Sequence, residues 1–197
     1  MTDNISKNNG AAGVGVFTPT PGTSSHNHLI LANELIGNIN PGVIFHSHAP
    51  GQNLTGTEVV GNLIERNGAE PDPGPGESDG PAVPTGIEVY ADVTALPIDA
   101  HILGNTITDE TNVIWIGAPS WANCGGAPTP CYNASVYLNN LLGGQTGVNN
   151  VGSGADVAVG AANNFWGCRN GPGASGCSKA AGNVSTTPFL TKSVKFP

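Results

Sequence analysis

The chain has 197 residues, of which 38% are hydrophobic, which is enough for one domain with an apolar core. Only 10% are charged, the net charge is −8, and Lys and Arg together number six. This composition argues against nucleic acid, which needs clustered cations, and no apolar stretch is long enough to cross a membrane. The 29 Gly and 16 Pro, combined with many β-branched residues, predict short strands joined by tight corners.

A pattern of 27 or 28 residues repeats along the first half of the chain. Each copy opens with Gly and an apolar strand, at Gly13, Gly42 and Gly86. Each later carries an Asn followed two positions on by an apolar residue: Asn33 and Leu35, Asn62 and Ile64, Asn105 and Ile107. Two degraded copies start near Val113, with Asn139 and Leu141, and near Val148, with Asn163 and Phe165. A fixed period of this kind predicts a solenoid.

The recurring Asn has a physical reason in a stacked coil. Equivalent residues on successive coils lie about 4.8 Å apart, so their side-chain amides can form a ladder. Asn also tolerates the left-handed conformation of a sharp corner. A helix over Leu29–Ile36 is the competing interpretation, but the aligned segments carry Gly and β-branched residues that disfavour helix.

We therefore predict an all-β fold, a single right-handed parallel β-helix of about five coils spanning residues 1–197. Residues 1–12 read as a partial first coil, so the chain begins in mid-coil, and further coils or another chain are expected at that edge. Residues 166–197 form a C-terminal cap region in which Trp166 is a cap or core residue. Residues 69–85 and 119–131 are insertions that we expect to flank one face.

Alternation in the opening strands predicts a ribbon of polar and aromatic side chains on one outer face. The residues expected to point inward are Val43, Phe45, Ile87, Val89, Ile114 and Ile116. The outward set is then Ile44, His46, His48, Glu88, Tyr90, Asp92 and Trp115, with Phe17 preceding His46. Sugars stack on exposed aromatics while polar neighbours bond their hydroxyls, so Tyr90, Trp115 and Trp121 are the stacking candidates. The alternative is that these aromatics only cover the solenoid.

Metal binding is a weaker hypothesis. His46, His48 and Asp92 could hold copper or another metal, but the second His-x-His pair, His26 and His28, falls elsewhere in its coil. The acidic insertion at 69–85 could take calcium, although it lacks the ligand spacing of a calcium loop. We expect no cofactor.

Four cysteines form two close pairs, Cys124 with Cys131 and Cys168 with Cys177. Each pair brackets a Gly-rich and Pro-rich loop, which favours local disulfides in an oxidising compartment over a zinc site. A zinc site on four thiolates remains the rival interpretation.

The repeat and the ending NNFWGCRNGPGASGC…GNVSTTPFL (163–190) resemble the parallel β-helix repeat proteins, which include pectate-lyase-like and copper-maturation (NosD-like) solenoids. That ending is similar to the end of many secreted bacterial members. The resemblance implies, for a lyase, stacked acidic calcium ligands with an Arg or Lys base. Arg66 and Arg169 both lie outside the ribbon, so the lyase pattern does not carry over. Glu88 and Asp92 are about 13 Å apart at strand rise, too far for a glycosidase pair.

The expected function is a secreted, extracellular or periplasmic, non-catalytic module that binds a neutral polysaccharide of the plant cell-wall type. One alternative is a polysaccharide-degrading enzyme of the same fold, whether lyase, hydrolase or metal-dependent. Another is a structural surface protein that self-associates through its N-terminal coil. The expected partner is polysaccharide, with no nucleic acid and no membrane.

Overall fold

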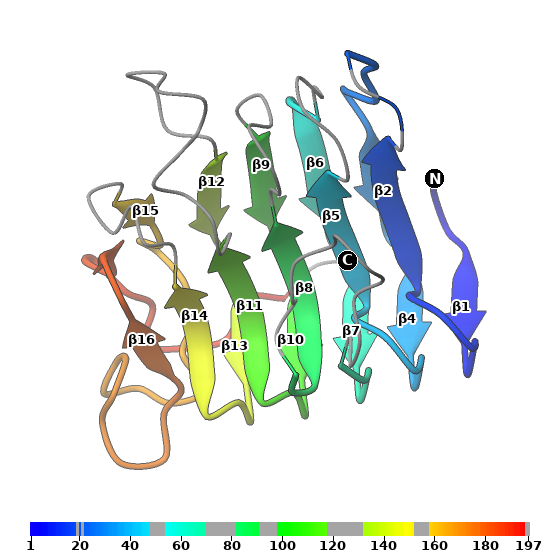
Figure 1. Cartoon of the computed structure of the whole chain (residues 1–197). Coiled ribbons are helices and arrows are strands. Elements are labelled where there is room, and N and C mark those ends of the chain that lie inside the picture. The colour runs from blue at the N-terminus through cyan, green and yellow to red at the C-terminus, as the bar shows by residue number, and fades with distance from the viewer. Residues whose placement is uncertain are drawn as a thin grey trace.

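The computed structural model of this chain is a solenoid built from three parallel β-sheets (Figure 1). It describes residues 1–18, 20, 22–47, 54–69, 82–90, 98–117, 132–151 and 158–195. Within this part of the chain all paired strands run parallel, and no helix is present. The chain passes through the three sheets in turn, in the right-handed sense usual for parallel crossovers (Figure 1). The predicted all-β parallel β-helix is confirmed.

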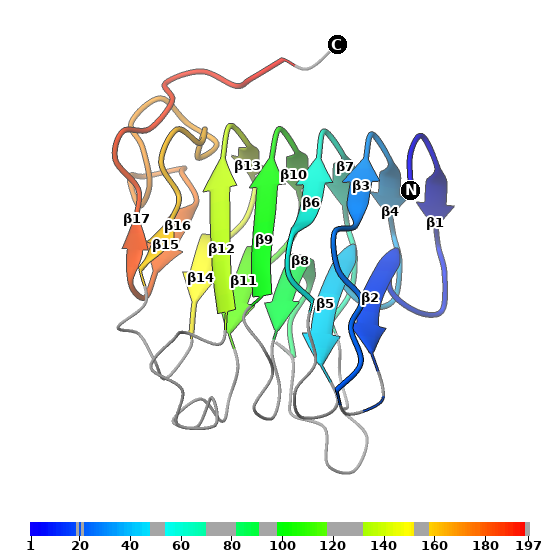
Figure 2. The ribbon, with the colours of Figure 1, turned by 90° about the horizontal axis from the view of Figure 1, so that it is seen from above.

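We name the sheets in the order in which the chain visits them. Sheet I contains β2 (Val14–Thr18), β5 (Val43–Ser47), β8 (Thr85–Tyr90), β11 (Asn112–Gly117), β14 (Thr146–Asn150) and β16 (Lys179–Ala181). Sheet II contains β3 (Leu29–Leu31), β6 (Thr57–Val60), β9 (Ile98–Leu103), β12 (Tyr132–Tyr137), β15 (Val159–Gly160) and β17 (Val184–Ser185). Sheet III contains β1 (Ile5–Lys7), β4 (Glu34–Ile36), β7 (Leu63–Glu65), β10 (Thr106–Thr108) and β13 (Asn140–Leu142). Figure 2 shows the strands of sheet II side by side.

The core is a set of apolar columns, one residue from each coil. One column of sheet I runs through Val14, Val43, Ile87, Ile114 and Val148. The column of sheet III runs through Leu35, Ile64, Ile107 and Leu141. The six side chains predicted to point inward from the opening strands are all fully buried. Burial in these columns stabilises the fold by about 0.8 kcal/mol per CH₂ group. Because each side chain contacts its equivalents on the neighbouring coils, the coils stabilise each other.

An asparagine ladder runs along the corner between sheets II and III. The backbone N–H and the side-chain Nδ2 of each Asn both donate to Oδ1 of the Asn on the next coil, at 2.8–3.1 Å. Its members are Asn4, Asn33, Asn62, Asn105, Asn139 and Asn164. All except Asn4 are buried. The ladder thus satisfies backbone groups at a corner that the sheets themselves leave unpaired.

A second ladder, which the sequence analysis did not find, lies five residues further along each coil. Asn9 donates to Asn38 and Asn38 to Asn67 by the same pair of bonds, at 2.8–3.2 Å. Asn67 then donates through both nitrogens to a carboxylate oxygen of Glu110, at 2.8 and 3.0 Å. Glu110 therefore occupies the position that Asn holds on the preceding coils.

The left-handed residue at these corners is not the ladder Asn but the residue before it. Positive φ angles occur at Ala32, Gly61, Gly104, Leu138 and Asn163, each immediately ahead of a ladder Asn. The expectation that Asn itself takes the left-handed conformation was therefore wrong for the ladder. The ladder Asn is selected by its side-chain amide, and the residue in front of it makes the turn.

The fifth copy of the repeat is shifted by one residue from its predicted position. Asn164, not Asn163, accepts both bonds from Asn139. Trp166 then fills the inward position and is fully buried in the core cluster. Of the two predicted roles, cap or core residue, it has that of a core residue. Phe165 forms bridges to Asn140 and to Leu190.

The two predicted insertions fall at different corners. Residues 69–85 follow β7 and run into β8, between sheets III and I, whereas residues 119–131 separate β11 from β12, between sheets I and II. Each insertion is therefore joined to a strand of sheet I, and nearly all of its residues lie outside the described ranges, so the expectation that the two flank one face stays a prediction. Cys168 and Cys177 form a disulfide, whereas Cys124 and Cys131 lie outside the described residues.

Substitution of Asn62 by Ala tests the ladder. It removes the acceptor of two buried Asn33 donors, the backbone N–H and Nδ2, and one of the two donors to Asn105 Oδ1, which keeps the backbone N–H of residue 62. We expect a loss of about 3 kcal/mol or more in the free energy of unfolding, because each orphaned buried group costs about 1–3 kcal/mol. Chemical denaturation followed by circular dichroism measures this loss. Asn4→Ala, at the exposed end of the same ladder, should cost about 1 kcal/mol or less; equal losses would contradict a stabilising role for the buried part of the ladder.

Candidate functional site

The ribbon predicted on sheet I is described only in part. Pairing places Ile44, Glu88 and Trp115 side by side on neighbouring strands, and Phe17 beside His46. The three members of the first column are nonetheless buried, with exposed fractions of 4%, 0% and 8%. This column therefore offers little surface on which a sugar could stack.

The remaining predicted ribbon residues stay predictions. His46 and Tyr90 lie in β5 and β8, but their side chains are outside the description. His48, Asp92 and Trp121 are outside the described residues altogether. The metal site predicted at His46, His48 and Asp92 therefore lies outside the described residues and side chains and stays a prediction.

The outer face of sheet II carries a polar column that crosses successive coils. Glu58, His101 and Ser135 lie in register on β6, β9 and β12, while their neighbours Val59 and Ile102 point into the core. Glu58 is exposed and Ser135 half-buried. Strand pairing places His101 directly beside Glu58 on the neighbouring coil.

Asp99 joins this polar column from the same strand as His101. His101 Nε2 lies 3.3 Å from an Asp99 carboxylate oxygen, and the two side chains are 41% and 43% exposed. Asp99 and His101 are two residues apart on β9 and therefore share its outer face. The result is a group of one imidazole, one hydroxyl and two carboxylates open to solvent.

An apolar column runs beside the polar one. Leu31, Val60, Leu103 and Tyr137 are in register on β3, β6, β9 and β12, and all four are half-buried. Their spacing follows the coil repeat of about 4.8 Å. Sheet II, whose strands lie side by side in Figure 2, thus presents a polar strip and an apolar strip that both cross successive coils.

The outer face of sheet III is partly covered by the C-terminal segment. Val194 donates its backbone N–H to Asn140 Oδ1 at 2.7 Å and accepts from Asn140 Nδ2 at 2.8 Å. At the other end of this sheet Lys7 pairs with Glu34 at 2.5 Å. On sheet II, by contrast, Glu58, His101 and Ser135 form a row of hydrogen-bonding side chains that are exposed or half-buried.

A hollow of about 240 Å³ lies at the N-terminal end of the solenoid. Val14, Val16, Leu29 and Ile30 give it an apolar lining, and Ser25 Oγ and His28 Nε2 approach within 2.7 Å at its wall. Within the described ranges no group of three His, Cys, Asp or Glu side chains is arranged to hold a metal ion. The His26 and His28 pair forms no such cluster.

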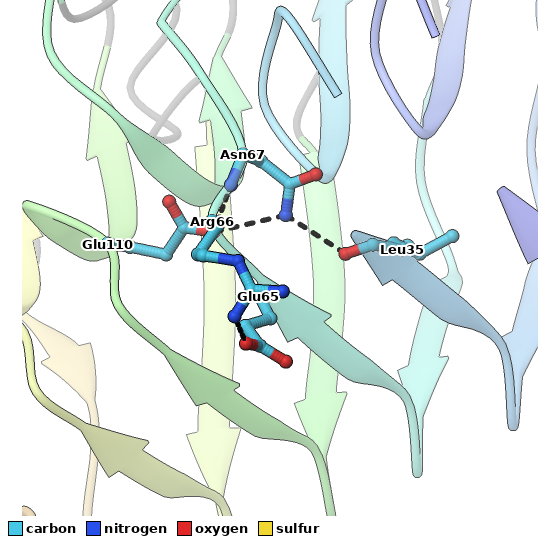
Figure 3. A network of polar contacts seen from close by, with 5 residues as sticks. All are labelled: Leu35, Glu65, Arg66, Asn67 and Glu110. Atoms are coloured by element: carbon cyan, nitrogen blue, oxygen red, sulfur yellow. Dashed lines mark hydrogen bonds and ion pairs between the residues drawn. The ribbon is translucent and has the colours of Figure 1, made fainter. Parts of the chain in front are cut away.

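Glu110 is the buried ionisable group of the second ladder. Figure 3 shows Asn67 between Glu110 and the carbonyl oxygen of Leu35, with Arg66 paired to Glu65 beside it. Burial raises the pKa of Glu110 from 4.5 to about 7, against the two hydrogen bonds from Asn67, which lower it; the charge of Asp109 adds to the rise. Glu110 does not follow from a repeat defined by Asn alone, although the five-residue spacing of Asn in NELIGN and NLIERN was a usable signal.

Comparison with known proteins found no matching family model, no matching curated protein and no matching solved structure. Within the described residues no helix is long and apolar enough to span a membrane. The fold, the disulfide and the geometry of the outer faces are therefore the basis for any functional conclusion.

Glu110 gives stability a specific dependence on pH. The pKa of Glu110 is raised from 4.5 to about 7. Between these two pH values the folded state therefore retains a proton that the unfolded state has lost. The contribution of protonated Glu110 to the free energy of unfolding is fully present below pH 4.5 and is lost as the pH rises through 7. We expect Glu110→Gln to be more stable than wild type above pH 7, by up to roughly 3 kcal/mol, with the gap closing toward pH 4.5.

Denaturation of both proteins from pH 4 to 8 measures this gap. Asp3→Asn removes one charge at an exposed position and controls for net charge. A gap that does not change with pH, or one that Asp3→Asn reproduces, would show that Glu110 does not titrate in this range.

Proposed function

We propose that this protein is a secreted, non-catalytic module that binds a neutral polysaccharide along the outer face of sheet II. The observation that carries the proposal is the pair of strips on that face, one polar through Glu58 and His101 and one apolar ending at Tyr137. A sugar ring has an apolar face and a rim of hydroxyls, so a glycan chain fits an apolar strip with hydrogen-bonding groups alongside. Because both strips continue over several coils, an extended ligand is favoured over a small one.

Sheet II is favoured over the ribbon first expected on sheet I. Trp115 has only 8% of its surface exposed and Glu88 none, so direct stacking there would require a change at that face. On sheet II, His101 and Asp99 are each about two-fifths exposed and need no rearrangement to meet a ligand.

Secretion, bacterial origin and superfamily membership are part of the same proposal. The Cys168–Cys177 disulfide supports an oxidising compartment, as expected for a secreted bacterial protein. The parallel coils and the asparagine ladder support membership of the pectate-lyase-like superfamily of β-helix proteins. Many functions occur on one fold, so the binding assignment depends on the sheet II surface rather than on this likeness.

The proposal is tested by pull-down of the whole chain on insoluble cellulose, xylan and mannan. We expect Tyr137→Ala combined with His101→Ala to weaken binding at least tenfold, because it removes the aromatic and one hydrogen-bonding group from the face. Leu142→Ala, a half-buried outer position on sheet III, is the matched control and should bind as wild type does. Circular dichroism checks that each variant is folded.

A second double variant distinguishes the two faces. If Tyr90→Ala with Trp115→Ala abolishes binding while the sheet II variant retains it, the ligand lies on sheet I and the assignment to sheet II is wrong. No binding of wild type to any of the three glycans would reject the neutral-polysaccharide proposal.

One observation favours hydrolysis as a second candidate function. Glu58 is in register with His101, and Asp99 lies two residues before His101 on the same face. Strand geometry places the Cα atoms of Glu58 and Asp99 about 8 Å apart. Inverting glycosidases hold their two carboxyl groups about 6.5–9.5 Å apart.

Release of reducing ends in the same tubes tests this second function. If the pair is catalytic, wild type releases sugar, and Glu58→Gln and Asp99→Asn each lower the rate at least a hundredfold while binding is kept. Ser135→Ala, on the same column, is the control and should keep the rate. Binding without sugar release identifies a non-catalytic module.

A further inference from the structure

The C-terminal part of the chain differs in charge from the rest. Residues 158–197 contain four of the six cations and no Asp or Glu, giving +4, while the remaining residues carry −12. These four cations are Arg169, Lys179, Lys192 and Lys195. In the rest of the chain Lys7 pairs with Glu34 and Arg66 with Glu65, whereas none of the four forms an ion pair with a described residue.

Two of these cations line one hollow. Arg169 and Asn170 approach from the loop closed by the Cys168–Cys177 disulfide, and Thr191 and Lys192 from the segment after the last bridge. The hollow has a volume of about 460 Å³. We call it the C-terminal hollow.

Packing fixes the two walls of the hollow against each other. Gly171 has φ of +85° and is buried, and a Cβ added there would come within 2.6 Å of the Phe189 ring. The loop backbone therefore lies directly on the ring that precedes the second wall. This contact, together with the disulfide, holds the Arg169 and Lys192 segments at one place on the surface.

The lining consists of groups that donate hydrogen bonds. The guanidinium has five donors and the ammonium three, and neither accepts. Asn170 and Thr191 add an amide and a hydroxyl donor, and no carboxylate lines the hollow. Such a set matches an oxyanion, for which Arg supplies a planar pair of donors.

We propose that the C-terminal hollow binds an oxyanion, the carboxylate or sulfate group of an acidic sugar. The hollow and its chemistry stand independently of sheet II; only the assignment of the oxyanion to a glycan rests on the proposed function. On that basis the protein prefers a polysaccharide whose neutral chain carries occasional acidic units.

Titration calorimetry on the whole chain tests the proposal with three probes: a glucuronic acid-containing xylo-oligosaccharide, the same oligosaccharide without the acid, and inorganic sulfate. We expect Arg169→Gln with Lys192→Gln to weaken binding of the acidic oligosaccharide tenfold or more, since it removes both charge-assisted hydrogen-bond donors from the hollow. Binding of the neutral oligosaccharide should not change. Inorganic sulfate should lower the affinity for the acidic oligosaccharide to that for the neutral one, and no further.

Lys179→Gln with Lys195→Gln is the matched control, because it removes the same charge from the same segment outside the hollow. It should weaken binding less than threefold. Equal losses in the two double variants, or equal affinity of wild type for the acidic and neutral oligosaccharides, would overturn the proposal. If the Tyr137→Ala and His101→Ala double variant binds both oligosaccharides more weakly but keeps the same affinity ratio between them, the loss belongs to the sheet II surface and the oxyanion site stands.

Discussion

The structure depends on one repeated hydrogen-bonding arrangement, in which a single amide oxygen receives two donors from the preceding coil. A parallel coil must turn sharply between sheets, and each turn interrupts the sheet hydrogen bonds. The ladder at Asn33, Asn62 and Asn105 restores them with a side chain that is both donor and acceptor. Once the corner is fixed, the residue two positions on faces inward, and the apolar columns follow from that geometry.

Much of the fold could be predicted from the sequence because the period is carried by residues with narrow physical roles. Gly13, Gly42 and Gly86 do stand next to one another at the start of β2, β5 and β8: a Cβ on Gly13 would meet the Gly42 carbonyl oxygen at 2.6 Å. The one-residue error at Asn163 arose because two Asn are adjacent there. In the structure Trp166, and not Phe165, takes the inward position and is fully buried, which puts Asn164 in the ladder.

The candidate site could be predicted less well. Alternation assigns Glu88 and Trp115 to the outside of their strands correctly, but it does not tell whether an outward side chain meets solvent. Exposure depends on what lies over the sheet, which is a tertiary property. Sheet II was overlooked for the opposite reason: its polar residues are common surface types, and only register brings Glu58, His101 and Ser135 into one column. Glu110 was missed because a carboxylate takes the place of an amide.

The ladders also give the solenoid a direction. Each Asn donates toward the C-terminal end and accepts from the N-terminal end, so the two ends differ in chemistry. At the first coil no described donor reaches Oδ1 of Asn4 or Asn9, and both residues are exposed. At the last coil Asn164 turns its Nδ2 to backbone carbonyl groups, and pairing of Phe165 with Leu190 puts Phe189 where the next Asn would stand. One end thus offers lone pairs in the spacing of another coil, whereas the other end offers an aromatic ring, so copies stacked head to tail would bring an acceptor against a hydrocarbon.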